Sequence, residues 1–204
     1  MSPSRREIQA EQTRQEILRA ARVLFGSQGY NATTVSQIAE AAGVSTQTIY
    51  DSVGPKAALV TALNDHIHAE ANVGELLSGI TGDTTAEEIV GVAIAICRGI
   101  VETAGDIIRT ATHAGPNVPE LRAVLEEGTR RHREGVGRVT GRIYTLGRIR
   151  SGTSLAEATG TIAALTDETF WIHLIDAYGW SLDQVADWAT DAVTRLVLTE
   201  LPSN

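Results

Sequence analysis

The sequence predicts an all-α protein of about nine helices. Hydrophobic residues recur at helical spacing along most of the 204 residues, and no alternating pattern is long enough to indicate a strand. Gly29, Gly115-Pro116, Gly179 and Pro202 lie where helical patterns stop, as residues that end helices do. A chain of this length can bury a substantial core in one or two domains.

The first helix is expected from about residue 8 to residue 28. Its inward face carries Ile17, Ala21 and Phe25, which recur every four residues, and Gly29 closes it. Because these side chains form a single stripe, the helix is expected to pack on one face against the elements that follow it.

The segment from Thr33 to Leu59 has the pattern of a helix-turn-helix. Thr34 and Gln37 have the spacing of a capping box, in which each side chain satisfies a free backbone N–H at the start of a helix. Gly43 suits the positive φ that ends this helix, and Ser45 caps a second short helix. Such a pair places its second helix in the DNA major groove. Similar short pairs also occur in enzymes, so the geometry alone leaves both possibilities open.

The residues around this motif add a family resemblance. The matching segment reads ILRAARVLFGSQGYNATTVSQIAEAAGVS, followed by TIY and then by Lys56 and Leu59. With these residues in register, positions 17–59 resemble the N-terminal domain of the TetR family of transcriptional regulators. Gln47, Ser52 and Val53 replace residues usual in that family, which affects the DNA sequence recognised rather than the fold.

The expected DNA contacts come from small hydrogen-bonding or basic side chains. Thr46, Gln47 and Thr48 are expected to reach base edges, whereas Tyr50 and Lys56 are expected to contact phosphate. The complete predicted DNA-binding set is Arg5, Arg6, Thr34, Ser45, Thr46, Gln47, Thr48, Tyr50 and Lys56.

The net charge of −8 would repel DNA if it were spread evenly, but it is distributed unevenly along the chain. Residues 1–60 hold six Lys and Arg against five Asp and Glu, whereas the remainder holds eleven against twenty. Because phosphate attraction depends on the local patch, only the N-terminal part is expected to touch DNA. Arg5 and Arg6 precede the expected first helix and form either a flexible arm that reaches DNA or a solvated terminus.

The remaining chain continues as helices. Thr85 and Glu88 repeat the capping-box spacing, and Pro119 suits the first turn of a long helix. Ser154 with Glu157 and Ser181 with Gln184 mark two further starts. The expected helices after the helix-turn-helix cover about residues 56–73, 85–100, 106–113, 119–146, 154–177 and 181–201. The predicted division is a helix-turn-helix DNA-binding domain over residues 1–58 and a ligand-binding and dimerisation domain over residues 59–204.

The long helix from Pro119 separates charge from hydrophobic side chains. One face carries a row of alternating charge, which the sequence identifies as a solvated face: Glu126, Arg130, Glu134 and Arg138. The opposite, apolar stripe includes His132, which is either a hydrogen-bonded core histidine or a ligand contact. Gly128 and Gly135 lack side chains on that stripe, so a cavity is expected beside them.

Three inward apolar stripes, together with these glycines, predict a mostly apolar cavity for a small-molecule effector, between the helices that contain Ile96, His132 and Leu165. The remaining predicted polar and aromatic contacts are Arg98, His113, Tyr144 and Trp171, although core is the default interpretation for the tryptophan.

The helix over residues 154–177 is apolar on two faces, and a second copy of the chain is the natural cover for one of them. The resemblance implies the same, because in the TetR family the last two helices pair across a two-fold axis as a four-helix bundle. The predicted homodimer contacts are Phe170, Leu174, Ala177 and Trp188.

Other function classes find little support. Cys97 is the only cysteine, which excludes disulfide frameworks within one chain, and no catalytic motif, metal site or cofactor-binding loop is recognisable. The N-terminus has no signal-peptide core and no apolar run reaches the ~18 residues that span a membrane, so a cytoplasmic location is expected. The prediction is a non-enzymatic repressor released by a small molecule from a pseudo-palindromic operator in double-stranded DNA. The alternative is a helical dimerisation or binding module that has lost sequence-specific DNA binding.

Overall fold

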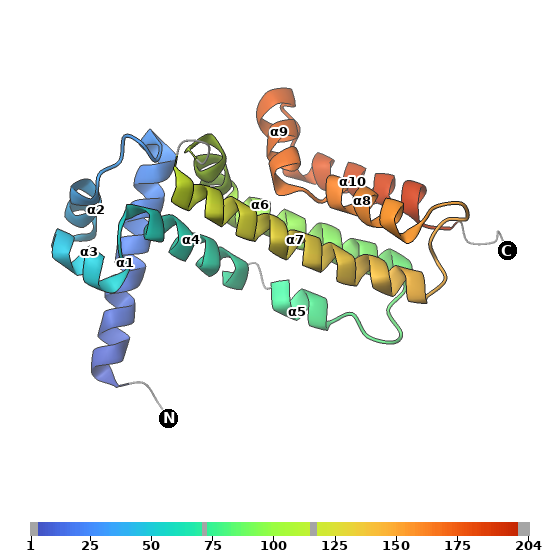
Figure 1. Ribbon diagram of the computed structural model, residues 1–204, viewed down its shortest axis with the longest axis horizontal. Coiled ribbons are helices and arrows are strands. Elements are labelled where there is room, and N and C mark those ends of the chain that lie inside the picture. The colour runs from blue at the N-terminus through green and yellow to red at the C-terminus, as the bar shows by residue number, and fades with distance from the viewer. Residues whose placement is uncertain (1–3, 71–72, 115–117, 200–204) are drawn as a thin grey trace. The chain divides into compact units, whose positions relative to one another are not determined.

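The computed structural model describes residues 4–70, 73–114 and 118–199, and these residues form ten helices (Figure 1). None of the described helices is long and apolar enough to cross a membrane. The helices are α1 (Arg5–Gln28), α2 (Val35–Ala42), α3 (Thr46–Ser52), α4 (Lys56–Glu70), α5 (Val73–Ser78), α6 (Ala86–Ala114), α7 (Pro119–Thr145), α8 (Leu155–Leu165), α9 (Glu168–Tyr178) and α10 (Leu182–Val197).

The chain divides into two compact units, each built from two stretches of sequence. The first comprises Met1–Ile67 with Asp106–Glu126, and the second comprises His68–Gly105 with Glu127–Asn204. The division therefore follows packing and cuts through α4, α6 and α7. The functional boundary expected at residue 58 remains a prediction.

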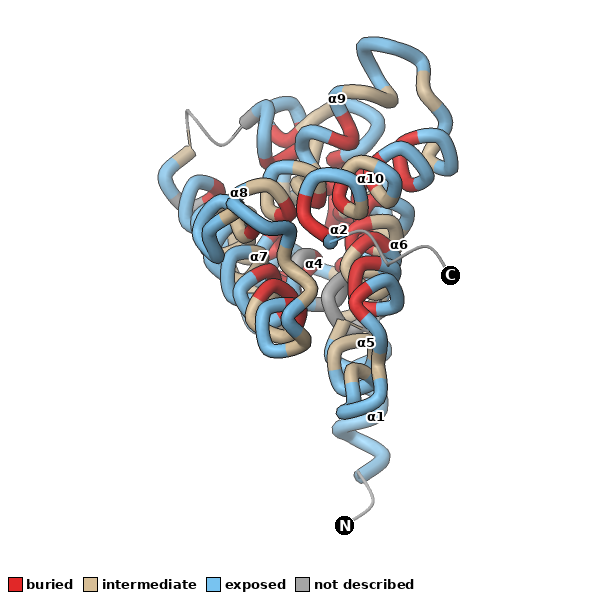
Figure 2. The backbone as a smooth tube through the Cα atoms, turned by 90° about the vertical axis from the view of Figure 1, so that its right-hand side faces the viewer, coloured by how far each residue is buried: buried red, intermediate tan, exposed pale blue. Residues whose placement is uncertain are grey.

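In the first unit, α1 packs against α2 and α3. Ile17 and Phe25 of α1, Ile38 of α2 and Ile49 of α3 are all at most 1% exposed. Fully burying a side chain of this size contributes roughly 1.5–3 kcal/mol, so these four residues fix the short helices on the longer one. By contrast, the first turns of α1, over residues 5–12, are exposed (Figure 2).

An ion pair joins α1 to the part of α6 that belongs to the same unit. Arg22 donates to Asp106 through Nε at 2.8 Å and through Nη2 at 3.0 Å. A paired contact of this kind fixes direction as well as distance, because both planar groups must be coplanar. It therefore orients α1 relative to this end of α6.

In the second unit, α8 and α9 both pack against α10. Ile162, Trp171, Val185 and Val193 are at most 1% exposed and form the centre of this packing. A single antiparallel β-bridge between Ile149 and Leu198 ties the end of α10 to the loop that follows α7.

The stretch expected as one helix over residues 154–177 is two helices, and that prediction was wrong. The Thr166 backbone N–H ends α8 by donating to Ile162 O at 2.9 Å. The side chain of Asp167 then caps α9, because its Oδ1 accepts from the Phe170 backbone N–H at 2.9 Å. The hydrophobic spacing continues across the break and so conceals it.

Three other boundaries differ from expectation. Helix α1 begins at Arg5 rather than near residue 8, and α6 runs without a break through the segment expected as a separate short helix at 106–113. The helix expected over residues 56–73 ends as α4 at Glu70, and Val73 begins α5, with residues 71–72 outside the described chain.

Candidate functional site

The helix-turn-helix forms as its local sequence requires. The Gln37 backbone N–H donates to Thr34 Oγ1 at 3.2 Å, and the Thr34 backbone N–H donates to Gln37 Oε1 at 2.8 Å, which completes the expected capping box. Gly43 ends α2 with a φ of 67°, in the left-handed region that favours glycine. Ser45 caps α3 by accepting from the Thr48 backbone N–H at 3.0 Å. Thr34, a predicted DNA contact, thus also has a structural role.

Helix α3 presents polar side chains to solvent. Thr46 and Gln47 are exposed, Thr48 is half-buried, and Tyr50 is 51% exposed, whereas Ile49 points into the core. The Gln47 side-chain amide donates to Asp51 Oδ1 at 2.7 Å. This bond fixes the orientation of the amide that is expected to read a base. The structure therefore adds Asp51, a residue absent from the predicted set, to the exposed face of α3.

Lys56 has a partner in the first unit. Its ammonium nitrogen lies 4.0 Å from the centre of the Tyr30 ring, within the range of a cation–π contact. Burial lowers the pKa of Lys56 below its ordinary value. Arg14 of α1 donates to the Ser52 carbonyl at the end of α3, at 3.1 Å.

Arg5 and Arg6 do not precede the first helix as expected, because they form its first turn. The Ser4 backbone N–H donates to Glu7 Oε2 at 2.6 Å, and the Glu7 backbone N–H donates to Ser4 Oγ at 3.3 Å. The bonds from Ser4, first from its backbone and then from its side chain, lower the pKa of Glu7. The structure therefore shows a helical turn rather than a flexible arm at these two positions. The Ser-x-x-Glu spacing of Ser4 and Glu7 is the sequence pattern that predicts this helix start. The contact of Arg5 and Arg6 with DNA remains a prediction.

A cavity of about 310 Å³ lies within the second unit. Its walls come from α5, α6, α7 and the α8–α9 junction, and Gly128 and Gly135 of α7 line it as the missing side chains predicted. The apolar wall residues include Leu77, Ala93, Ile96, Ile100, Val136 and Val139. This size and this predominantly apolar lining suit a small organic molecule.

A few polar groups interrupt these apolar walls. His132 Nε2 lies 3.0 Å from Thr166 Oγ1, and the Thr166 hydroxyl also donates to the Ile162 carbonyl at 2.8 Å. Glu168, the first residue of α9, lines the cavity beside them. Burial raises the pKa of its carboxyl, and the nearby His132 partly opposes that shift. Burial also raises the pKa of the Cys97 thiol well above its ordinary value, and the charges of Glu168 and Asp167 add to it.

With this geometry established, comparisons with known proteins identify the first unit. Residues 17–63 match the sequence model of a family described as bacterial regulatory proteins, tetR family. This match covers the helix-turn-helix and about the first half of α4, so it is a likeness of the N-terminal helices. The chain is 42% identical over 64 residues to the HTH-type transcriptional regulator TtgR of Pseudomonas putida, an alignment that covers 31% of this chain and 30% of TtgR. The chain is thus aligned to less than a third of the length of the curated relatives it matches.

The likeness of fold extends over nearly the whole chain. NalD of Pseudomonas aeruginosa, described as the secondary repressor of the MexAB-OprM multidrug efflux pump, is 23% identical, with a TM-score of 0.75 over 94% of this chain and 100% of NalD. FadR of Bacillus subtilis, solved with stearoyl-CoA, is 20% identical, with a TM-score of 0.70 over 90% of this chain and 97% of FadR. The chain therefore shares its fold, including the C-terminal helices, with these two solved structures.

Of the predicted ligand contacts, Ile96 and His132 line the cavity, and the other five do not. Arg98 pairs with Asp183 at 2.5 Å, and Tyr144 is 60% exposed. Trp171 is fully buried, and its ring N–H donates to the Leu165 carbonyl at 2.8 Å, so both residues belong to the packing between α8 and α9. The structure places His113 in the first unit, beside a different hollow.

Sequence reasoning missed Thr166 and Glu168 as cavity residues, because both lie at the unpredicted break between α8 and α9. An aspartate followed by Glu-Thr-Phe is a recognisable helix start, and Asp167 was the available signal.

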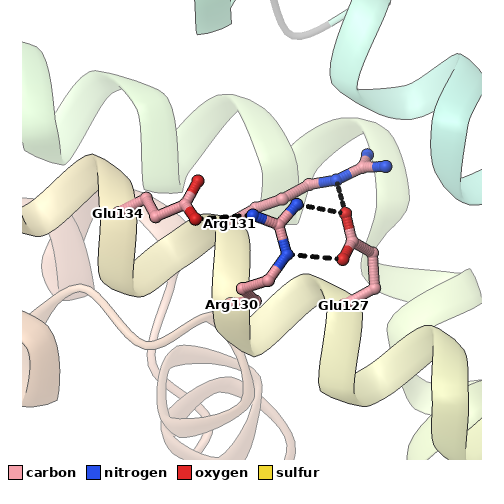
Figure 3. A network of polar contacts seen from close by, with 4 residues as sticks. All are labelled: Glu127, Arg130, Arg131 and Glu134. Atoms are coloured by element: carbon pink, nitrogen blue, oxygen red, sulfur yellow. Dashed lines mark hydrogen bonds and ion pairs between the residues drawn. The ribbon is translucent and has the colours of Figure 1, made fainter.

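Part of the charged face of α7 pairs within the helix, as expected for Arg130 with Glu134. Arg130 bonds to both Glu127 and Glu134, and Arg131 bonds to Glu127 at 2.7 Å (Figure 3). Hydrogen bonds from Arg130 and then Arg131 lower the pKa of Glu127 to about 2, and those from Glu127 and Glu134 raise the pKa of Arg130. Arg130 and Arg131 therefore have carboxylate partners within the protein, and their charges give no indication of a second nucleic-acid site.

The predicted dimer contacts form an aromatic surface on α9 and α10. Phe170 is 38% exposed and Trp188 is 37% exposed, and their ring centres lie 6.0 Å apart. Trp180 meets Trp188 edge-on at 5.9 Å. Leu174 is half-buried and Ala177 is exposed on α9. Exposed aromatic clusters of this kind are typical of surfaces that another protein covers.

Proposed function

We propose that the protein is a transcriptional repressor that binds a pseudo-palindromic operator as a homodimer and is released by a small molecule. The observation that carries this proposal is α3, a short helix with exposed hydrogen-bonding side chains, held on a fully buried scaffold within a TetR-family domain. A helix presented in this way suits the major groove, where base edges offer a distinctive pattern of donors and acceptors.

The roles on DNA follow from side-chain chemistry. Gln47 is the residue best suited to a paired contact with an adenine, because its amide offers one donor and one acceptor. The adjacent Thr46 and Thr48 offer hydroxyls, while Tyr50 and Lys56 suit phosphate oxygens. The negative charge of Asp51 repels phosphate, so this carboxylate is expected to weaken non-specific binding to DNA.

The dimer places two copies of α3 on one face of DNA. In this proposal the aromatic surface around Phe170 and Trp188 packs against its own copy across a two-fold axis, as isologous interfaces do. Two recognition helices then enter successive major grooves ~34 Å apart, which requires an operator with two related half-sites. Binding to chromosomal DNA also requires the protein to act in the cytoplasm.

The cavity supplies the response to a ligand. Helix α6 lines the cavity with Ile96 and also carries Asp106, the partner of Arg22 on α1. A ligand that favours the conformation with wrongly spaced recognition helices must weaken DNA binding by its differential affinity for the two states. Related structures support such a role, since SmeT is described in complex with triclosan and FadR with stearoyl-CoA.

Gel retardation tests the proposal. The purified protein should retard a fragment from upstream of its own gene at concentrations that leave an unrelated fragment of equal length unbound. Equal retardation of both fragments, or of neither, would favour a helical dimerisation module that has lost sequence-specific binding.

A further inference from the structure

Glu168 is a carboxylate in a mostly apolar cavity. It begins α9 immediately after the capping residue Asp167, and it lines the same space as Ile96 and Ile100. Among the described residues, no other side chain donates a hydrogen bond to it. Glu168 is half-buried, and the rise in pKa that burial causes in its carboxyl is partly opposed by a hydrogen bond that the carboxyl accepts from its own backbone N–H. A bound cation offsets the remaining desolvation energy.

The bond between His132 and Thr166 has a defined direction. The single hydroxyl hydrogen of Thr166 is donated to the Ile162 carbonyl at 2.8 Å, so its oxygen accepts at 3.0 Å from His132 Nε2, which must carry a hydrogen. The bond therefore occupies Nε2 of the ring as a donor to Thr166. Glu168 is the carboxylate acceptor that the cavity offers to a ligand beside this pair.

Two arginines, Arg131 and Arg138, also line the cavity, and each is less available to a ligand than Glu168. Arg131 is bonded to Glu127 at 2.7 Å, and Arg138 is exposed, so water and salt screen its charge. Glu134, which also lines the cavity, is exposed and bonded to Arg130. The charged group that ligand binding affects most is therefore Glu168.

We propose that the cavity takes an apolar molecule with one basic nitrogen, whose protonated form donates a hydrogen bond to the carboxylate of Glu168. The apolar body lies against the aliphatic walls from α5, α6 and α7. The raised pKa of Glu168 agrees with this arrangement, because burial disfavours its charged form and the nearby His132 offsets this only in part. The inference rests on the proposed function only for its consequence, the release of DNA.

Three naphthalene probes that share one apolar body test the proposal: 2-(1-naphthyl)ethylamine, 2-(1-naphthyl)ethanol and 1-naphthylacetate. Fluorescence titration of the full-length protein should give the tightest binding for the amine and the weakest for the carboxylate. Glu168→Gln should weaken amine binding by about tenfold or more, the worth of one charge-assisted hydrogen bond, and change alcohol binding by less than about twofold.

Glu102→Gln is the matched control, because Glu102 is exposed on α6 outside the cavity lining and loses the same charge. It should leave amine binding within about twofold of the unsubstituted protein. Circular dichroism melting of each variant verifies its fold, and Glu168→Asp, which keeps the charge, should retain part of the preference for the amine.

The unsubstituted protein gives a decisive result even if Glu168→Gln fails to fold. Tighter binding of the carboxylate than of the amine, or amine binding no tighter than alcohol binding, would overturn the inference. Gel retardation of the upstream DNA separates this failure from failure of the proposed function. A protein that prefers the amine through Glu168 but binds no specific DNA supports the inference and refutes the repressor, and the reverse pattern does the opposite.

Discussion

Replacing Gly135 with alanine should stabilise the protein and shrink its cavity. Gly135 lies in the middle of α7 and lines the cavity, and no heavy atom outside its own helical surroundings lies within 4 Å of the position that an alanine methyl would take. Alanine in a helix interior is more stable than glycine by roughly 0.5–1 kcal/mol, because it restricts the unfolded chain. The methyl then projects into free space, so no clash offsets this gain.

The matched control is Gly137→Ala. Gly137 lies on the same helix, is exposed, and also has free space at the methyl position, but it does not line the cavity. Urea unfolding should show both variants to be about 0.5–1 kcal/mol more stable than the unsubstituted protein, which corresponds to a rise in Tm of roughly 1–4 °C for a chain of this size.

Ligand binding should distinguish the two variants. A series of straight-chain alcohols of increasing length measures the cavity without charge, and affinity should rise with length until the chain no longer fits. The optimal length should fall by about one carbon in Gly135→Ala and stay unchanged in Gly137→Ala, because a methyl replaces about one methylene of ligand. An unchanged optimum in Gly135→Ala, or a loss of stability there, would refute the described cavity.

Three further predictions address DNA binding, assembly and ligand response. Gln47→Ala should cost about 1–3 kcal/mol of operator binding and relax base preference, whereas Lys56→Ala should weaken binding to all sequences and reduce the salt slope by about one. Anisotropy titrations across salt concentrations and operator variants measure both, and unchanged affinity in both variants would contradict the assigned contacts. Phe170→Asp or Leu174→Asp should give monomers that no longer bind an intact palindrome, and sedimentation showing unaltered dimers would mean that another face pairs. His132→Leu should change ligand-dependent release while operator affinity and dimerisation stay the same, whereas a shift of the melting temperature with no selective effect on release would indicate a core role alone.

The sequence was most informative where structure depends on local hydrogen bonds. The capping box of Thr34 with Gln37 and the left-handed Gly43 were both predictable, because each involves residues at most a few positions apart. The same rule applied to Ser4 and to Asp167 would have placed the start of α1 and the break before α9 correctly.

The cavity was only partly predictable, because its lining depends on how helices distant in sequence pack together. The apolar stripe and the glycines of α7 located one wall, and Ile96 located a second. The default interpretation of Trp171 as a core residue agrees with its full burial. Periodicity could not show that Arg98 turns toward Asp183, since that depends on tertiary packing. Glu168 was missed because the hydrophobic spacing runs through the α8–α9 junction that brings it to the cavity.

Thermodynamic linkage gives the most direct test of the central claim that one chain couples a ligand cavity to a DNA-reading helix. The measurement is operator affinity with and without a saturating cavity ligand such as 2-(1-naphthyl)ethylamine, paired with the affinity for that ligand with and without operator DNA. The account predicts that each weakens the other by the same factor, because the coupling free energy is shared. Equal operator affinity with and without a ligand that demonstrably fills the cavity would contradict it.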